Sequence, residues 1–132
     1  MTRKKKGKRR RINAPQKRKM SEIIWEFAGD FIRMGDTPEE KHSLLNAACS
    51  AWSIACNSPD LRKKNLDHYM REYRRFNPGA DEEELAGVRS NMEKLIETKL
   101  KMFPTDLRQI VGARIYPSGG KDRIEIMSAR VG

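Results

Sequence analysis

The side chains that could bind a metal or act as a nucleophile are few, and their spacing argues against both roles. The chain holds two His and two Cys, and His42, Cys49 and Cys56 recur at intervals of seven residues on one face of a predicted helix. Seven helical residues rise about 10.5 Å. That separation is too large for one zinc ion, with Zn–S bonds of about 2.3 Å, and for a disulfide within the helix. The sequence therefore predicts no metal site, and we interpret the cysteines as small buried hydrophobic residues.

No group of residues has the composition of a catalytic site. His68 has no Cys, Ser or Asp partner at a recognisable spacing. Gly119-Gly120-Lys121 is not a phosphate-binding loop, because the rest of that pattern and the helix that follows it are missing. We therefore expect a protein that is not an enzyme, with no catalytic residue and no cofactor.

Three acidic residues, Glu22, Glu26 and Asp30, recur every four residues on one face of a predicted helix. No His or further ligand accompanies them, so the pattern favours neither metal binding nor acid–base chemistry. Two interpretations remain: a face exposed to solvent, or a strip on which the protein's own basic N-terminal segment docks. The second interpretation predicts a lower affinity for nucleic acid than the basic segment alone would have.

The strongest pattern is that basic segment. Residues 1–19, here called the basic arm, contain eleven Lys or Arg and no acid, whereas the remaining residues hold 17 basic and 18 acidic side chains. The arm repels itself and cannot bury apolar surface, so we expect it to be disordered alone. Its cations suit the phosphates of RNA or DNA. The candidate phosphate-binding residues are Arg3, Lys4, Lys5, Lys6, Lys8, Arg9, Arg10, Arg11, Lys17, Arg18 and Lys19.

The composition of the basic arm also limits how it binds. It contains no aromatic residue, so it lacks a platform on which single-stranded bases stack. We expect it to hold the protein on phosphates without reading bases. A solubilising tail and a nuclear-localisation-like stretch are the two competing interpretations.

A second basic patch is predicted on the third helix. Arg71, Arg74 and Arg75 lie away from the apolar seam of that helix and would extend the contact surface of the basic arm along a duplex. Asp67 and Glu72 interrupt the patch, so simple exposure to solvent is the favoured interpretation.

Capping signals define where the elements that position these side chains begin and end. Thr37-Pro-Glu-Glu40 and Asp81-Glu-Glu-Glu84 have the form of capping boxes, Ser58 precedes Pro59 as an N-cap, and Gly35 stops the first helix. The fourth helix has acids at its start and Lys99 and Lys101 near its end, as the helix dipole prefers.

Apolar periodicity indicates the fold class. Four segments show helical spacing, and the pattern changes to strand-like alternation after Pro104. The second segment is apolar nearly all round, so it should be central. Apolar residues on the first segment continue to Met34, and the seam of the third consists of Leu66, Tyr69, Tyr73 and Phe76. The sequence predicts a mainly α fold, a compact bundle of about four helices (20–34, 37–56, 59–76 and 81–103) with a C-terminal two-stranded β-hairpin at about 109–129.

Chain length and composition bound the organisation and the location. Residues 20–132 are of the usual size for one globular domain. No apolar run approaches the roughly 20 residues of a membrane span, and no apolar segment follows the basic start as in a secretory signal. Two cysteines make no disulfide framework. We expect a cytoplasmic protein, with nucleoid or ribosome association possible (nuclear if the source is eukaryotic), and no membrane partner.

These patterns favour a small non-enzymatic nucleic-acid-associated protein whose basic arm contacts RNA or DNA. The sequence does not separate RNA from DNA, and it leaves the oligomeric state open. The alternative is a protein–protein adaptor or regulatory module whose neutral helical body binds a protein partner. A continuous positive surface from the arm to Arg71, Arg74 and Arg75 would favour the first function, and an exposed apolar patch the second.

Overall fold

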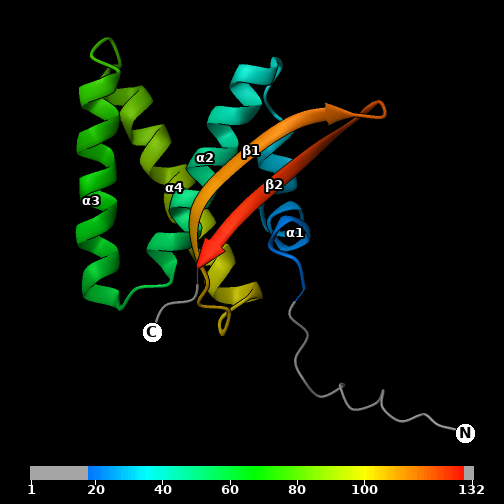
Figure 1. The fold of residues 1–132 in the computed structure, drawn as a ribbon. Helices are drawn as coiled ribbons and strands as arrows, with labels where there is room; N and C mark the ends of the chain where they lie inside the picture. Colours follow the sequence, from blue (N-terminus) through cyan, green and yellow to red (C-terminus); the bar gives the residue numbers. More distant parts are fainter. Residues whose placement is uncertain (1–17, 130–132) are drawn as a thin grey trace, which may run out of the picture.

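The computed structural model describes residues 18–129, which form four helices and one hairpin. In chain order the elements are α1 (Met20–Ile32), α2 (Pro38–Ala55), α3 (Pro59–Phe76), α4 (Glu82–Met102), β1 (Gln109–Ser118) and β2 (Lys121–Ala129) (Figure 1). The predicted mainly α fold with a C-terminal hairpin is therefore confirmed. The disorder expected of the basic arm, residues 1–19, stays a prediction, because residues 1–17 lie outside the described residues.

Two of the three predicted N-caps are present as hydrogen bonds. The Thr37 side chain accepts from the Glu40 backbone N–H at 3.1 Å, and Asp81 accepts from the Glu84 N–H at 2.8 Å. Each bond satisfies an N–H that a helix start leaves without a backbone partner. Ser58 occupies the N-cap position of α3 and Pro59 its first turn, as predicted, but the Ser58 side chain makes no capping hydrogen bond.

The first helix ends earlier than its apolar pattern suggests. Its backbone is kinked at Ala28 (φ −138°, ψ 16°), it stops at Ile32, and Met34 is 70% exposed. Gly35 then brings the chain against the start of α2, where a Cβ at this position would lie 2.8 Å from the backbone nitrogen of Lys41. The close approach, rather than a helix cap, requires glycine here.

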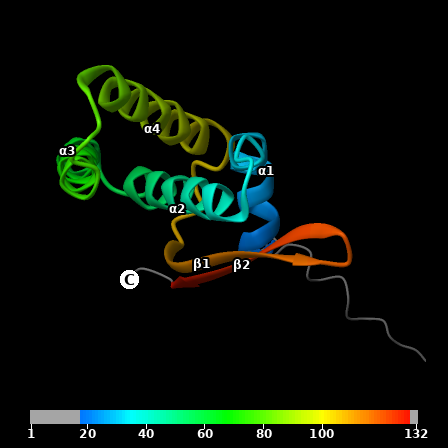
Figure 2. The same cartoon turned by 90° about the horizontal axis from the view of Figure 1, so that it is seen from above.

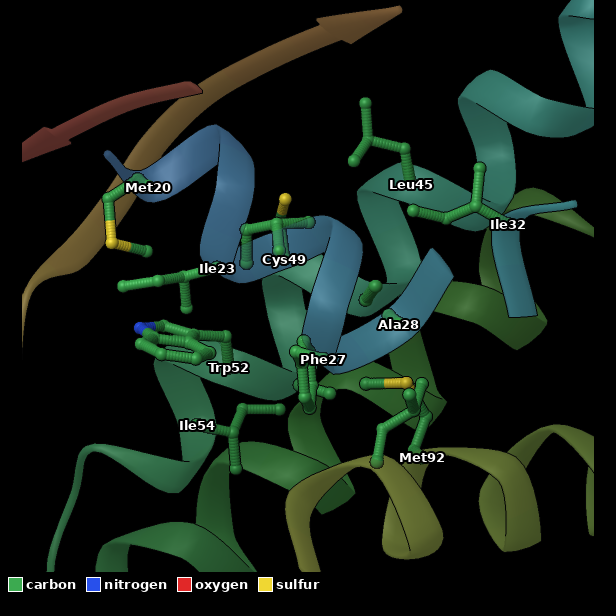
Figure 3. Packing of buried hydrophobic residues seen from close by; sticks show 14 of the residues in the cluster. Met20, Ile23, Phe27, Ala28, Ile32, Leu45, Cys49, Trp52, Ile54 and Met92 are labelled. Carbon is green, nitrogen blue, oxygen red and sulfur yellow. The ribbon is translucent and has the colours of Figure 1, made fainter. Parts of the chain in front are cut away.

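The hydrophobic core is built around α2, as its apolar surface predicts. Seen from above, α2 lies between α4 and the hairpin, while α1 and α3 flank it on opposite sides (Figure 2). Trp52 is fully buried at the centre, with its ring in edge contact with Phe27 at 5.4 Å between centroids (Figure 3). Met92 of α4 and Ile124 of β2 join the same cluster. The helices and the hairpin therefore share one core.

The hairpin is closed by a two-residue turn. Gly119 and Gly120 have φ values of 60° and 79°, and positive φ at both positions is the requirement of a type I′ turn. The register pairs Ile115 with Ile124, and both pack on the core. An isolated hairpin is marginal in water, so this packing supports it.

The third helix is the least buried of the four helices. Leu66 is its one buried residue, and Phe76, which the sequence places on the seam, is 70% exposed. Because α3 lies at the edge of the bundle (Figure 2), its far end has too few neighbours to cover Phe76. Among the helices of the described part of the chain, none combines the length and apolar character of a membrane span.

Candidate nucleic-acid interface

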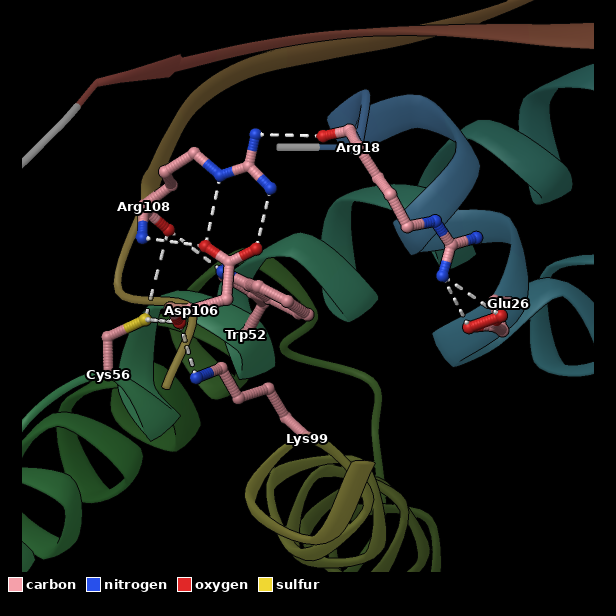
Figure 4. Close-up of polar contacts among 7 residues, drawn as sticks. All are labelled: Arg18, Glu26, Trp52, Cys56, Lys99, Asp106 and Arg108. Carbon is pink, nitrogen blue, oxygen red and sulfur yellow. Dashed lines mark hydrogen bonds and ion pairs between the residues drawn. The ribbon is translucent and has the colours of Figure 1, made fainter. Parts of the chain in front are cut away.

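Two contacts hold the place where the basic arm joins the folded body. The Arg18 guanidinium pairs with the Glu26 carboxylate at 3.1 Å, and the Arg18 carbonyl accepts a hydrogen bond from Arg108 Nη1 at 3.0 Å (Figure 4). Arg108 is itself held by both carboxylate oxygens of Asp106, with Nη2–Oδ2 at 2.6 Å and Nε–Oδ1 at 3.0 Å. These contacts therefore fix Arg18 beside α1.

The electrostatics of these pairs follow from their hydrogen bonds. The bond to Glu26 raises the pKa of Arg18, and the bonds from Arg108 lower the pKa of Asp106 below its usual 3.8. The Asp106–Arg108 pair is the more sheltered of the two, since its side chains are 18% and 19% exposed. It is thus the firmer of the two anchors.

The acidic row on α1 meets the arm at one position. Glu26 contacts Arg18, Asp30 pairs with Arg33 at 2.8 Å, and Glu22 has no ion pair within residues 18–129. One arm residue thus docks on the row. Docking of the rest of the arm concerns residues outside the described part of the chain and stays a prediction.

A surface groove opens next to Arg18, which joins the arm to the body and is here called the arm's root. The groove lies between the start of α1 and the hairpin. Its volume is about 470 Å³, and we call it the α1–hairpin groove. It is lined by Lys19, Ser21, Glu22 and Trp25 from the α1 side and by Tyr116, Lys121, Asp122, Arg123 and Ile124 from the hairpin.

The groove carries an excess of positive charge. Lys19, Lys121 and Arg123 form no ion pair with any described residue, whereas Asp122 is neutralised by Lys41 at 2.7 Å. Glu22 is the remaining carboxylate of the groove. Three cations against one carboxylate leave a positive surface that continues from the arm into the body.

Lys19 of this groove is among the predicted phosphate-binding residues, whereas the other positive residues and the aromatic residues of the groove are not. Trp25 counts as an apolar helix residue, and Tyr116, Lys121 and Arg123 look like ordinary hairpin residues. One usable signal was the hairpin register, which sets Tyr116 directly opposite Arg123. The packing of the hairpin against α1 could not be predicted from the sequence, because the two elements lie nearly the whole length of the domain apart in the chain.

The second predicted patch lies elsewhere. Arg74 pairs with Glu82 at 3.1 Å, Arg75 pairs with Glu72 at 3.3 Å, and Arg71 is exposed. No contact joins α3 to α1, since α2 and α4 lie between them (Figure 2). The structure therefore does not bring these arginines together with the arm's root, and two of them are already paired with acidic side chains.

A buried polar cluster lies beneath the anchor (Figure 4). The Lys99 side chain is fully buried, its Nζ donates to the Asp106 carbonyl at 2.6 Å, and it lies 4.9 Å from the centre of the Trp52 ring. Burial lowers the pKa of Lys99. Trp52 Nε1 donates to the Arg108 carbonyl at 2.8 Å. The cluster joins α2 and α4 to the loop before β1, so Lys99 fixes the loop rather than serving the exposed end of a helix.

The cysteines are free thiols within the core. Cys49 is buried, which raises its pKa to about 12, and Cys56 is half-buried with its pKa raised by the same cause. The interpretation of Cys49 as a small hydrophobic residue is confirmed. Within residues 18–129, no cluster of three His, Cys, Asp or Glu side chains is arranged to hold a metal ion.

Comparison with protein-family models, curated proteins and solved structures found no match to this chain. Its function is therefore inferred from its own charge and geometry.

Proposed function

We propose that this is a small non-enzymatic nucleic-acid-binding protein whose basic arm contacts the phosphates of RNA or DNA without reading their sequence. The observation that carries the proposal is the segregation of charge. Residues 1–17 hold nine Lys or Arg and no acid, whereas residues 18–129 hold 18 of each sign. A dense run of cations on a neutral body binds polyanions through the release of counterions. The proposal includes a cytoplasmic location.

The geometry at the arm's root supports the same proposal. Lys19, Lys121 and Arg123 continue the positive surface onto the body, directly beside the residue at which the arm begins. A strand of nucleic acid held by the arm would therefore meet further cations in the groove. The arginines of α3 are expected to add little, because Arg74 and Arg75 already have acidic partners.

The test is a salt titration of binding, comparing the full chain with residues 18–132. The shorter chain keeps Arg18, whose carbonyl accepts from Arg108. If the nine cations of residues 1–17 and the three groove cations all contact phosphates, the slope of log K against log salt on duplex DNA approaches about −11. Removal of residues 1–17 should leave a slope no steeper than about −2.7. Equal slopes for the two chains would show that the arm does not bind, and no binding by either chain would exclude nucleic acid.

A protein-binding role is the second candidate, and one observation favours it. A groove of about 430 Å³ between α2 and α3 is lined by Tyr69, Tyr73 and Phe76, and Phe76 is 70% exposed. Exposed aromatic side chains are typical of protein interfaces. Cross-linking in nuclease-treated lysate tests this role. Partners that survive nuclease and are lost with Phe76→Ser would favour it, whereas partners lost on nuclease treatment alone would favour nucleic-acid binding.

A further inference from the structure

We propose that the α1–hairpin groove binds an unstacked base, so that the protein prefers single-stranded nucleic acid to duplexes. This inference rests on the proposed function, because the basic arm brings the strand to the groove. It assigns base contact to the folded body, whereas the arm itself has no aromatic residue.

The groove contains two aromatic rings, each held from one side by a guanidinium. Trp25 comes from α1 and Tyr116 from β1. The Arg33 guanidinium carbon lies 5.5 Å from the centre of the Trp25 ring, and that of Arg114 lies 4.9 Å from the centre of the Tyr116 ring. These cation–π contacts restrain both rings before any ligand arrives. Rings restrained in this way are suitable platforms for stacking a base.

The space around Trp25 is closely defined. A Cβ on Gly29 would lie 3.1 Å from Cε3 of Trp25 and 3.2 Å from the Arg33 guanidinium. Any larger residue at position 29 would therefore displace either the Trp25 ring or the Arg33 guanidinium that packs on it. The bare glycine backbone allows Trp25 and Arg33 to pack together at the edge of the groove.

Phosphate contacts are available beside the rings. Arg123 lies opposite Tyr116 in the hairpin register, and Lys19 and Lys121 line the same groove without an ion pair in the described part of the chain. The start of α1 adds to this surface, because no side chain caps it and Ser21 of its first turn lines the groove. The positive end of a helix attracts phosphate. Cations flanking aromatic rings match the alternation of phosphate and base along a single strand.

The rings determine which form of nucleic acid the groove prefers. In a duplex, the faces of the bases are covered by their stacked neighbours, so Trp25 and Tyr116 gain nothing from it. In a single strand, each base offers a free face for stacking, whatever its identity. The arm binds the phosphates of both forms. The difference in affinity between single strands and duplexes therefore comes from the groove.

The experiment compares an oligothymidylate with a mixed-sequence duplex of equal nucleotide number, using the full chain. Trp52 is fully buried, so a change in tryptophan fluorescence on binding reports Trp25. We expect quenching by oligothymidylate that is absent in Trp25→Phe. We expect Tyr116→Leu to weaken oligothymidylate binding about five- to hundredfold and to leave duplex affinity within about twofold. Tyr116→Phe should keep most of the affinity, since stacking needs the ring and not the hydroxyl.

The controls separate failure of the inference from failure of the proposed function. Tyr73→Leu, on α3 and outside the groove, should change neither affinity. Equal loss of both affinities in Tyr116→Leu would overturn the inference, as would equal wild-type affinity for the two probes without quenching. In the last case, binding through the arm still stands. If the wild-type chain binds neither probe, the proposed function falls as well. The quenching measurement needs no variant of Tyr116, so it decides the matter even if Tyr116→Leu does not fold.

Discussion

Replacement of Arg108 by Met removes the guanidinium that anchors the arm's root while keeping much of the aliphatic stem. In the folded protein this guanidinium donates to both oxygens of Asp106, at 2.6 and 3.0 Å, and to the Arg18 carbonyl at 3.0 Å. The variant therefore leaves a sheltered carboxylate with the Arg108 backbone N–H, at 3.2 Å, as its remaining donor among the described residues.

The expected loss follows from how sheltered the pair is. Removing one partner of a fully buried pair costs about 3–5 kcal/mol, and an exposed pair is worth about 0–1 kcal/mol. The Arg108 and Asp106 side chains are 19% and 18% exposed and make two charge-assisted hydrogen bonds. We therefore expect Arg108→Met to lower the free energy of unfolding by about 2–3 kcal/mol.

Urea unfolding of Arg108→Met, Asp106→Asn and the double variant measures the coupling directly. Because Arg108 lowers the pKa of Asp106, the pair stabilises the protein above the unfolded value of 3.8, and this contribution is lost as the pH falls through the folded pKa. The difference between wild type and Arg108→Met should thus shrink below pH 3.8. A coupling energy under about 0.5 kcal/mol at pH 7, or one that does not fall as the pH is lowered below 3.8, would refute the assignment of the pair as an anchor.

Three further predictions concern other parts of the molecule. Gly35→Ala should lower the free energy of unfolding by about 1–3 kcal/mol because its Cβ would meet the α2 backbone. Gly87→Ala, on α4 with open space around it, should raise that free energy by about 0.5–1 kcal/mol; the opposite order in urea unfolding would contradict the packing. Glu26→Gln frees its arginine partner and should steepen the salt slope on duplex DNA by about 0.9, whereas Glu97→Gln, on an exposed face of α4, should not. Since burial raises the pKa of Cys49 from 9.0 to about 12, stability present below pH 9 is lost as the pH rises through 12. Cys49→Ala should flatten this loss, and an unchanged slope of unfolding free energy above pH 9 would show that the thiol is not sheltered.

Short-range sequence patterns specify the helices and strands of this fold, which explains how well these elements could be predicted. Thr37 and Asp81 cap α2 and α4 through residues three positions away. Gly119 and Gly120 make the hairpin turn within the hairpin itself. Each of these choices depends on a few neighbouring residues, so the linear sequence contains all the information they need.

The errors fall where a residue's role depends on distant partners. Lys99 lies in the last turn of α4 as predicted, yet its position in the chain did not reveal that it is fully buried against Trp52 and the Asp106 carbonyl. Phe76 looks like a seam residue, yet it is 70% exposed because α3 lies at the edge of the bundle. Helical periodicity shows which face of a helix is apolar, but not how much of that face a neighbour covers.

The helices, the hairpin and the separation of a basic arm from a neutral body could be predicted from the linear chain, because propensity, capping and net charge are local or additive properties. The contacts of Arg18 with the body and the groove beside it depend instead on the packing of distant elements. Trp25 and Tyr116 line one groove because the hairpin packs across the start of α1. That packing arises from burial of Ile115 and Ile124 in the shared core, a long-range interaction that no local pattern records.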